Sequence, residues 1–139
     1  MTVSVLLITH DNIGATLLRT SAATLGFCPL QYNSLSVPPN CEPERLALLA
    51  KQQAAELNQG DGVLVLTDMY GSTPSNIACS LLELPYIRVV SGINLPMLIR
   101  VFNYPKLSLE KLVEKAISGG REGIMDCHTL IDSGQNNHD

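Results

Sequence analysis

The sequence lacks the features that define several classes of protein. Lys and Arg never cluster beyond two neighbours, and the net charge is −4. Nucleic-acid binding needs a basic patch, so we expect no nucleic-acid partner. The longest apolar runs are too short to span a bilayer, and the N-terminal MTVSVLLITHD has no basic region before its apolar run. We therefore expect a cytoplasmic protein.

Two chemical signatures are also missing. The cysteines have no CxxC spacing, which predicts free thiols rather than a zinc site or a disulfide framework; they are Cys28, Cys41, Cys79 and Cys127. The nucleotide-binding pattern GxxxxGK followed by Ser or Thr does not occur, which disfavours nucleotide hydrolysis. We therefore expect neither a metal site nor a cofactor.

The composition is that of a globular domain. The 139 residues are 45% hydrophobic and 16% charged, enough to build one core. We expect a single domain over residues 1–131. The last residues, 132–139, are polar and should form a frayed tail.

Short β-branched runs bounded by turn residues predict buried parallel strands. They are Val3–Ile8, Gly62–Leu66 and Ile87–Val90, and Leu30–Ser36 is a weaker fourth candidate. Helical patterns lie between and after them. They cover Ile13–Leu25, Glu42–Leu57, Pro74–Leu82, Pro96–Phe102 and Leu109–Ile117.

The alternation of strands and helices predicts an α/β fold: a doubly wound, mostly parallel open sheet flanked by helices. Asn40 is a plausible N-cap for the second helix, and Ser108 for the last. The pattern changes after Gly119-Gly120. There, Gly123–Ile131 (GIMDCHTLI) is expected to form a final strand at a sheet edge.

Polar and small residues follow three of the predicted strands. Thr9-His10-Asp11 follows the first, residues 67–74 (TDMYGSTP) follow the third, and residues 91–96 (SGINLP) follow the fourth. In open α/β sheets, ligands bind outside the carboxyl ends of the strands. The sequence therefore predicts a functional site at this edge.

His10 and Asp68 are the chemical candidates at that edge. A helix start beside His10 would favour an anion there. A carboxylate from Asp68 could bond one imidazole nitrogen, fix the tautomer and raise the basicity of the other nitrogen. The alternatives are a histidine that caps or packs and an acid that serves a turn. Asp11 is given no catalytic role.

A possible phosphate cradle follows the third predicted strand. Gly71, Ser72 and Thr73 supply a flexible glycine, two hydroxyls and a helix start, and backbone N–H groups there can bind a phosphoryl group. Thr9 and Thr67, which end two strands, are included among the expected phosphate-binding residues. An ordinary Ser or Thr N-cap is the alternative, and the two roles can coexist.

Four motifs in order give the chain a specific resemblance. They are Thr9-His10-Asp11, residues 67–78 (TDMYGSTPSNIA), residues 91–98 (SGINLPML) and residues 120–123 (GREG). Together they resemble the mannose-type IIA component of the bacterial phosphoenolpyruvate-dependent sugar phosphotransferase system, from Met1 to about Ile131.

The resemblance implies a phosphotransferase that works as a phosphohistidine carrier. It implies that His10 is phosphorylated on its tele nitrogen, that Asp68 orients the imidazole, and that Gly71, Ser72 and Thr73 shape the phosphate site. The donor would be the phosphocarrier protein HPr and the acceptor a IIB component that serves sugar uptake, with the membrane reached only through a permease. The strand after GREG would be exchanged between subunits, which implies a homodimer.

Two departures from the family pattern leave alternatives open. Many members carry Thr-His-Gly where this chain has Asp11, and a linker to a IIB domain is not seen before the sequence stops. The chain could therefore be a stand-alone regulatory IIA protein whose phosphorylation state controls partners. A dihydroxyacetone kinase phosphotransfer subunit, a receiver-like domain phosphorylated on Asp68, and a non-covalent small-molecule binding module are further alternatives.

Overall fold

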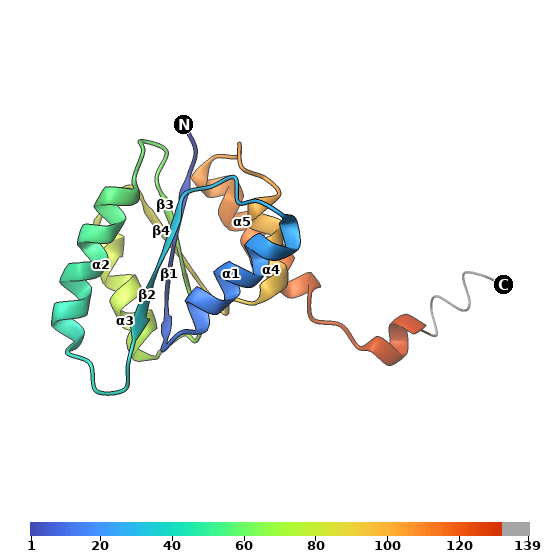
Figure 1. The fold of residues 1–139 in the computed structure, drawn as a ribbon, viewed down its shortest axis with the longest axis horizontal. Coiled ribbons are helices and arrows are strands. Elements are labelled where there is room, and N and C mark those ends of the chain that lie inside the picture. Colours follow the sequence, from blue (N-terminus) through green and yellow to red (C-terminus); the bar gives the residue numbers. More distant parts are fainter. Residues whose placement is uncertain (132–139) are drawn as a thin grey trace.

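A parallel four-stranded sheet forms the centre of the protein (Figure 1), in a computed structural model that describes residues 1–131. The expected frayed tail, residues 132–139, lies outside the described residues. The strands follow the order β2-β1-β3-β4. They span β1 (Ser4–His10), β2 (Tyr32–Val37), β3 (Val63–Thr67) and β4 (Ile87–Ser91). This arrangement confirms the predicted doubly wound sheet.

The register of the strands brings their carboxyl ends level. Ile8 of β1 pairs with Leu35 of β2 on one side and with Thr67 of β3 on the other. The central strands β1 and β3 are buried along almost their whole length. They are mostly apolar, apart from polar residues at their ends, because helices cover both faces of the sheet. His10, the last residue of β1, and Asp68, which directly follows β3, therefore lie side by side.

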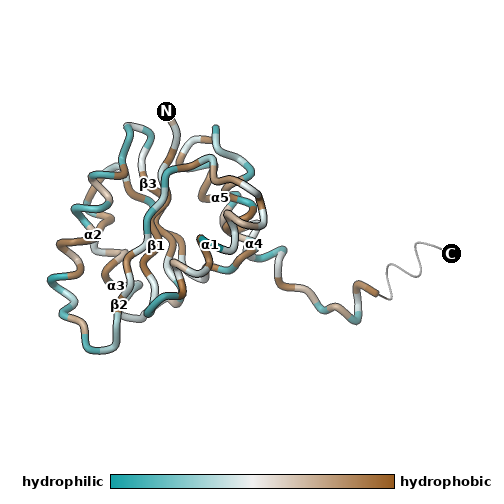
Figure 2. The backbone as a smooth tube through the Cα atoms, in the orientation of Figure 1, coloured by the Kyte–Doolittle hydropathy of each residue, from teal (hydrophilic) through white to brown (hydrophobic). Residues whose placement is uncertain are grey.

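Two groups of helices cover the two faces of the sheet (Figure 1). Side chains of β1 alternate between the two apolar clusters, with Leu7 on one face and Leu6 and Ile8 on the other. Figure 2 shows the same hydrophobic core along the strands. One face carries α1 (Ile13–Leu25), α4 (Leu95–Phe102) and α5 (Leu109–Glu122), and the other α2 (Pro43–Leu57), α3 (Thr73–Ser80) and the 3₁₀ turn Leu81–Glu83.

Helix starts follow local capping chemistry. Ser108 accepts a hydrogen bond from the backbone N–H of Lys111, which confirms it as the N-cap of α5. Asn40 is not the N-cap of α2. That helix starts at Pro43, with Glu42 in the N-cap position. The reason is that proline fixes the backbone of the first helical residue and needs no partner for an N–H.

The sequence pattern changes at Gly119-Gly120, but helix α5 does not end there. Helix α5 continues through both glycines to Glu122, beyond the expected end at Ile117. A Cβ atom at Gly119 would lie 2.5 Å from Cβ of Arg100 on α4. The glycine therefore allows a close approach of α4 and α5, a tertiary role that local sequence does not reveal.

The expected final strand over Gly123–Ile131 is wrong for this structure. Residues 127–131 are helical. The carboxylate of Asp126 accepts hydrogen bonds from the backbone N–H of His128 and the hydroxyl of Thr129, which makes Asp126 the start of a helical turn. The alternation of polar and apolar residues in this short segment was too weak a strand signal to outweigh the capping by Asp126, which favours a helical turn.

Replacing Gly119 by alanine should lower the free energy of unfolding by about 1–2 kcal/mol. Overpacking against Arg100 costs roughly 1–3 kcal/mol and exceeds the gain in helix propensity of about 1 kcal/mol. Gly120→Ala is the matched control. Its Cβ would meet Cε of Met97, the end of a flexible side chain, at 2.9 Å. Urea unfolding of the two variants measures the difference, and equal stabilities would contradict the packing argument.

Candidate functional site

The site lies where the chain reverses its winding direction. From β1 the chain passes to β2 on one side, and from β3 it passes to β4 on the other. The carboxyl ends of β1 and β3 therefore form the switch point at which open α/β sheets bind ligands. His10 is the last residue of β1, and Asp68 directly follows β3. The structure thus brings the two predicted residues together.

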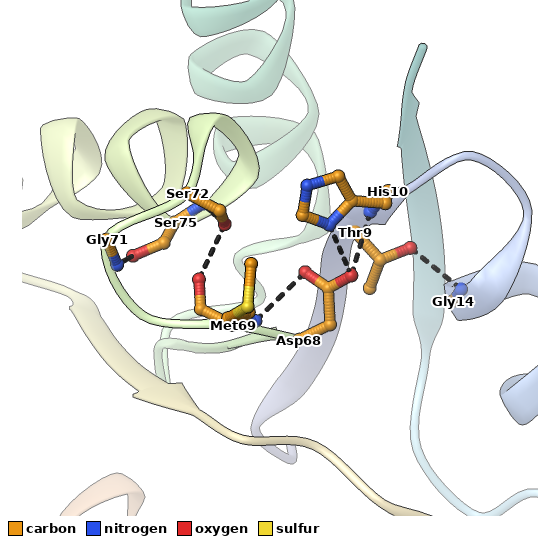
Figure 3. Close-up of polar contacts among 8 residues, drawn as sticks. All are labelled: Thr9, His10, Gly14, Asp68, Met69, Gly71, Ser72 and Ser75. Carbon is orange, nitrogen blue, oxygen red and sulfur yellow. Dashed lines mark hydrogen bonds and ion pairs between the residues drawn. The ribbon is translucent and has the colours of Figure 1, made fainter. Parts of the chain in front are cut away.

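Three hydrogen bonds fix the carboxylate of Asp68 (Figure 3). Its Oδ2 accepts from Nδ1 of His10 at 2.8 Å and from the backbone N–H of His10 at 3.0 Å. Its Oδ1 accepts from the backbone N–H of Met69 at 3.1 Å. The Asp68 side chain is 13% exposed, whereas that of His10 is 42% exposed. The pair therefore holds a solvent-accessible imidazole in one orientation.

The hydrogen bond to Asp68 also determines which imidazole nitrogen of His10 carries the proton. An ionised carboxylate only accepts hydrogen bonds, so Nδ1 of His10 must carry the proton. In a neutral imidazole, Nε2 then holds the lone pair. In Figure 3 this nitrogen points away from Asp68, on the side of the loop that carries Ser72. The arrangement presents a nucleophilic nitrogen at the surface.

Asp68 has a shifted pKa. Burial alone would raise it, but the hydrogen bonds from the His10 imidazole and from backbone N–H groups outweigh burial and hold the pKa below its ordinary value. The carboxylate therefore stays ionised to lower pH than an isolated aspartate. The charged carboxylate is the acceptor that favours the tautomer with the proton on Nδ1 of His10.

The loop between Asp68 and α3 is held by hydrogen bonds within itself. The hydroxyl of Ser72 donates to the Met69 carbonyl and accepts from the backbone N–H of Ser75. The backbone N–H of Gly71 donates to Oγ of Ser75 at 3.2 Å. Gly71 has φ of +85°, a conformation that favours glycine. The loop is thus preformed, with Ser72 as the N-cap of α3.

Thr73 begins α3 and offers two donors at its N-terminus. Within residues 1–131, neither its backbone N–H nor its hydroxyl makes a hydrogen bond. The N–H of Gly71, by contrast, is already engaged by Ser75. A helix N-terminus favours an anion, and free donors there can bind phosphoryl oxygens. The phosphate contacts expected for Gly71, Ser72 and Thr73 remain predictions.

Thr9 and Thr67 sit differently from the other expected phosphate-binding residues. Both are buried at the ends of their strands. The hydroxyl of Thr9 accepts a hydrogen bond from the backbone N–H of Gly14, and a Cβ at Gly14 would lie 2.9 Å from that oxygen. Thr9 therefore positions the start of α1. The hydroxyl of Thr67 is enclosed and has no hydrogen-bond partner among the described residues.

Asp11 adopts a conformation that is unusual for its residue type. Its φ is +41°, and within residues 1–131 it is the only residue other than glycine with a positive φ. A left-handed backbone costs an L-residue roughly 1–2 kcal/mol, and Asp is among the residues that tolerate it best. Asp11 is exposed and directly follows His10.

The polar turn that follows β4, residues 91–96, has a structural role. Gly92 has φ of +87°, and Asn94 caps α4 by accepting from the backbone N–H of Met97. The side-chain amide of Asn94 also donates to the Gly120 carbonyl, which ties α4 to α5. This turn therefore fixes the helices on one face of the sheet.

Sequence reasoning missed Ser75. Its buried hydroxyl accepts from the N–H of Gly71 and so shapes the loop beside His10. The only available signal was its position three residues after Ser72, within the first turn of α3. A serine in a first helical turn is common, so this signal is weak.

Three further observations concern the described residues, 1–131. No group of three or more His, Cys, Asp or Glu side chains there could hold a metal ion. No helix there is long and apolar enough to cross a membrane. The four cysteines are free thiols, as expected.

The fold and the site define a class: a doubly wound α/β protein with an acid-oriented histidine at its switch point. A family profile described as EIIA-man, PTS system fructose IIA component, matches residues 4–117. The chain therefore belongs to this family of IIA components of the sugar phosphotransferase system, as the resemblance implied. Membership implies a phosphotransferase-type phosphoryl-carrier role.

Individual relatives agree with this assignment. The mannose-specific EIIAB component of Escherichia coli (strain K12) is 31% identical over 129 residues, which cover 89% of this chain and 39% of the relative. The chain thus spans well under half the length of that curated relative.

Solved structures show the same fold. A PTS IIA protein associated with the fucose utilization operon of Streptococcus pneumoniae has a TM-score of 0.76 at 26% identity, covering 92% of this chain and 95% of that one. The mannose/sorbose specific IIA subunit from Enterococcus faecalis has a TM-score of 0.81 at 22% identity, covering 91% and 95%.

The His10–Asp68 pair should make stability depend on pH in the acid range. The pKa of Asp68 in the folded protein is lowered from the ordinary value of 3.8, which applies to the unfolded chain. At a pH between these two pKa values, the unfolded chain therefore binds more protons than the folded protein. The stabilisation is therefore complete above pH 3.8 and is lost as the pH falls through the folded pKa. Urea unfolding should show that the stability gap between the wild type and Asp68→Asn narrows as the pH falls from about 6 to about 3.

Asp61→Asn is the control for this measurement, because it removes an exposed charge that precedes β3 at the opposite end of the sheet. A gap between the wild type and Asp68→Asn that is constant with pH would contradict the assigned shift.

Proposed function

We propose that the chain carries phosphoryl groups: Nε2 of His10 accepts one from phospho-HPr and passes it to a IIB component for sugar uptake and phosphorylation. The observation that carries this proposal is the 2.8 Å hydrogen bond between Nδ1 of His10 and Asp68. It occupies one ring nitrogen and leaves the other as the nucleophile. The role of Asp68 is to position the imidazole, since it does not contact the transferred group.

The transfer step is an in-line displacement at phosphorus. Nε2 of His10 forms a bond to phosphorus while the bond from phosphorus to the donor's histidine nitrogen breaks, so the donor imidazole is the leaving group. The second transfer repeats this step with His10 as the leaving group. Such transfers depend on positioning and charge stabilisation. No cofactor takes part.

The loop beside His10 suits the incoming phosphoryl group. Thr73 offers a backbone N–H and a hydroxyl at the N-terminus of α3, and the Ser72 hydroxyl can exchange its Met69 partner for a phosphoryl oxygen. Preformed donors cost no reorganisation during the reaction. The buried Thr9 and Thr67 act behind this surface rather than on it.

A homodimer with an exchanged C-terminal segment is also part of the proposal. Strand β4 is at the edge of the described sheet, so one side of it has no strand partner. A hollow of about 440 Å³ lies along β4 and α5, lined by Val89, Ile117 and Ile124 among others. The segment that follows α5 extends away from the domain (Figure 1) and carries the exposed apolar residues Met125, Leu130 and Ile131. A second copy would bury these apolar side chains.

His10→Ala should remove all acid-labile label when the protein is mixed with phosphoenolpyruvate, enzyme I and HPr. The reason is that no other nucleophile replaces Nε2 at the switch point. Label on the wild type should survive base, because an acyl phosphate on Asp68 would be lost there and a phosphohistidine would not. Radiolabelling followed by gel electrophoresis measures both properties.

His128→Ala is the matched control, since it removes an exposed histidine in the segment that extends away from the domain after α5 (Figure 1) and should label like the wild type. Asp68→Asn should label more slowly, by roughly tenfold or more, because the amide no longer enforces the Nδ1–H tautomer. Undiminished labelling of His10→Ala would overturn the proposal, and an unchanged rate for Asp68→Asn would remove that residue from the mechanism.

Leu130→Glu should convert a dimer to a monomer. A charge at this position would be desolvated in the proposed interface, and burying an unpaired charge is costly. Leu48→Glu is the control, because Leu48 is an exposed apolar residue on α2, across the sheet. Sedimentation equilibrium distinguishes the two states. A monomeric wild type, or a dimer that tolerates Leu130→Glu, would contradict the proposed exchange.

A further inference from the structure

Asp11 occupies a backbone position that does not require a side chain. Its φ of +41° is one that glycine adopts without strain. Strand β2 fixes the backbone at this position, because the backbone N–H of Asp11 donates a hydrogen bond to the Val37 carbonyl at 3.1 Å. The strained conformation is therefore imposed by the fold, and the aspartate side chain does nothing to relieve it.

The carboxylate of Asp11 has no structural task. It makes no hydrogen bond or ion pair within the described residues. It does not cap the following helix either, since the N-cap of α1 is Asn12 and no side-chain cap bond forms there. A strained residue whose side chain stabilises nothing points to a role outside the folded chain.

Asp11 directly follows the residue that carries the exposed nucleophile, and its carboxylate forms no ion pair within the described residues. It belongs to the residue after His10, whose side chain is 42% exposed. The loops at this edge, residues 10–12, 38–42, 68–72 and 92–94, contain no Lys or Arg. Asp68, the other acid beside His10, is already bonded to the imidazole. Within residues 1–131 Asp11 forms no ion pair, so its charge is available to a cation of a partner.

We propose that Asp11 is a specificity-determining residue, whose carboxylate pairs with a cationic side chain of the donor phosphocarrier in the transfer complex. This inference rests on the proposed function of His10. Complementary charges at the rim of an interface select partners and speed their association. Without such a pair, the carboxylate would only repel the incoming phosphoryl group, so removing it would accelerate transfer. The sign of the effect therefore decides between attraction and repulsion.

The test measures phosphoryl transfer from phospho-HPr to the full chain as a function of HPr concentration and ionic strength. Asp11→Asn removes the charge and keeps the side-chain shape, whereas Asp11→Gly removes the side chain and the strain. Both variants should lose about fivefold in kcat/KM at low salt, the effect of one close ion pair in water. The loss should lie in KM, leave kcat unchanged and shrink at high salt because ions screen the pair.

Asp61→Asn supplies the control for net charge, since Asp61 is exposed near the start of β3; it should transfer like the wild type. Asp11→Gly should also unfold at the same or higher urea concentration, so that its loss is not one of folding. Unchanged or faster transfer by Asp11→Asn, or an equal loss in Asp61→Asn, would overturn the inference. A wild type that accepts no label from phospho-HPr would instead overturn the proposed function.

Discussion

The hydrogen bond between Asp68 and His10 joins the ends of two strands that belong to opposite halves of the sheet. It forms because the register of β1 and β3 places Ile8 opposite Thr67. A shift of one residue would turn the alternating side chains of β1 to the opposite faces of the sheet. The buried strands therefore bring the two residues together, so that the carboxylate of Asp68 lies 2.8 Å from Nδ1 of His10.

The carboxylate of Asp68 accepts three hydrogen bonds, and these explain the rigidity of the site. Asp68 accepts from the imidazole, from the backbone of His10 and from the backbone of Met69. Hydrogen bonds to a charged group contribute roughly 1.5–3 kcal/mol each. Any rotation of the imidazole away from Asp68 loses one of them. The orientation of Nε2 is thus set in the resting protein and costs little when a partner arrives.

The sequence predicted features that depend on local patterns and missed those that depend on distant contacts. Buried strands followed by polar residues indicated the sheet, and the position of His10 and Asp68 at its carboxyl edge followed from topology. The role of Gly119 depends on Arg100 of another helix, which no local pattern reveals. Thr9 was predicted to bind phosphate, and the structure adds a contact that the sequence did not indicate, a hydrogen bond from the backbone N–H of Gly14 to its hydroxyl.

A carrier needs a phosphoryl group that it can give away again. The two loops that follow β1 and β3 supply two carboxylates, Asp68 bonded to His10 and Asp11 without a hydrogen bond, and neither loop contains Lys or Arg. A site rich in Lys or Arg would stabilise the phosphorylated histidine and hold the group. In the proposed carrier, only neutral donors from Thr73 and its loop would face the phosphoryl group on His10, so they would position it without neutralising it. The proposal then requires the strongest stabilising charges to come from a partner, which would favour transfer within a complex.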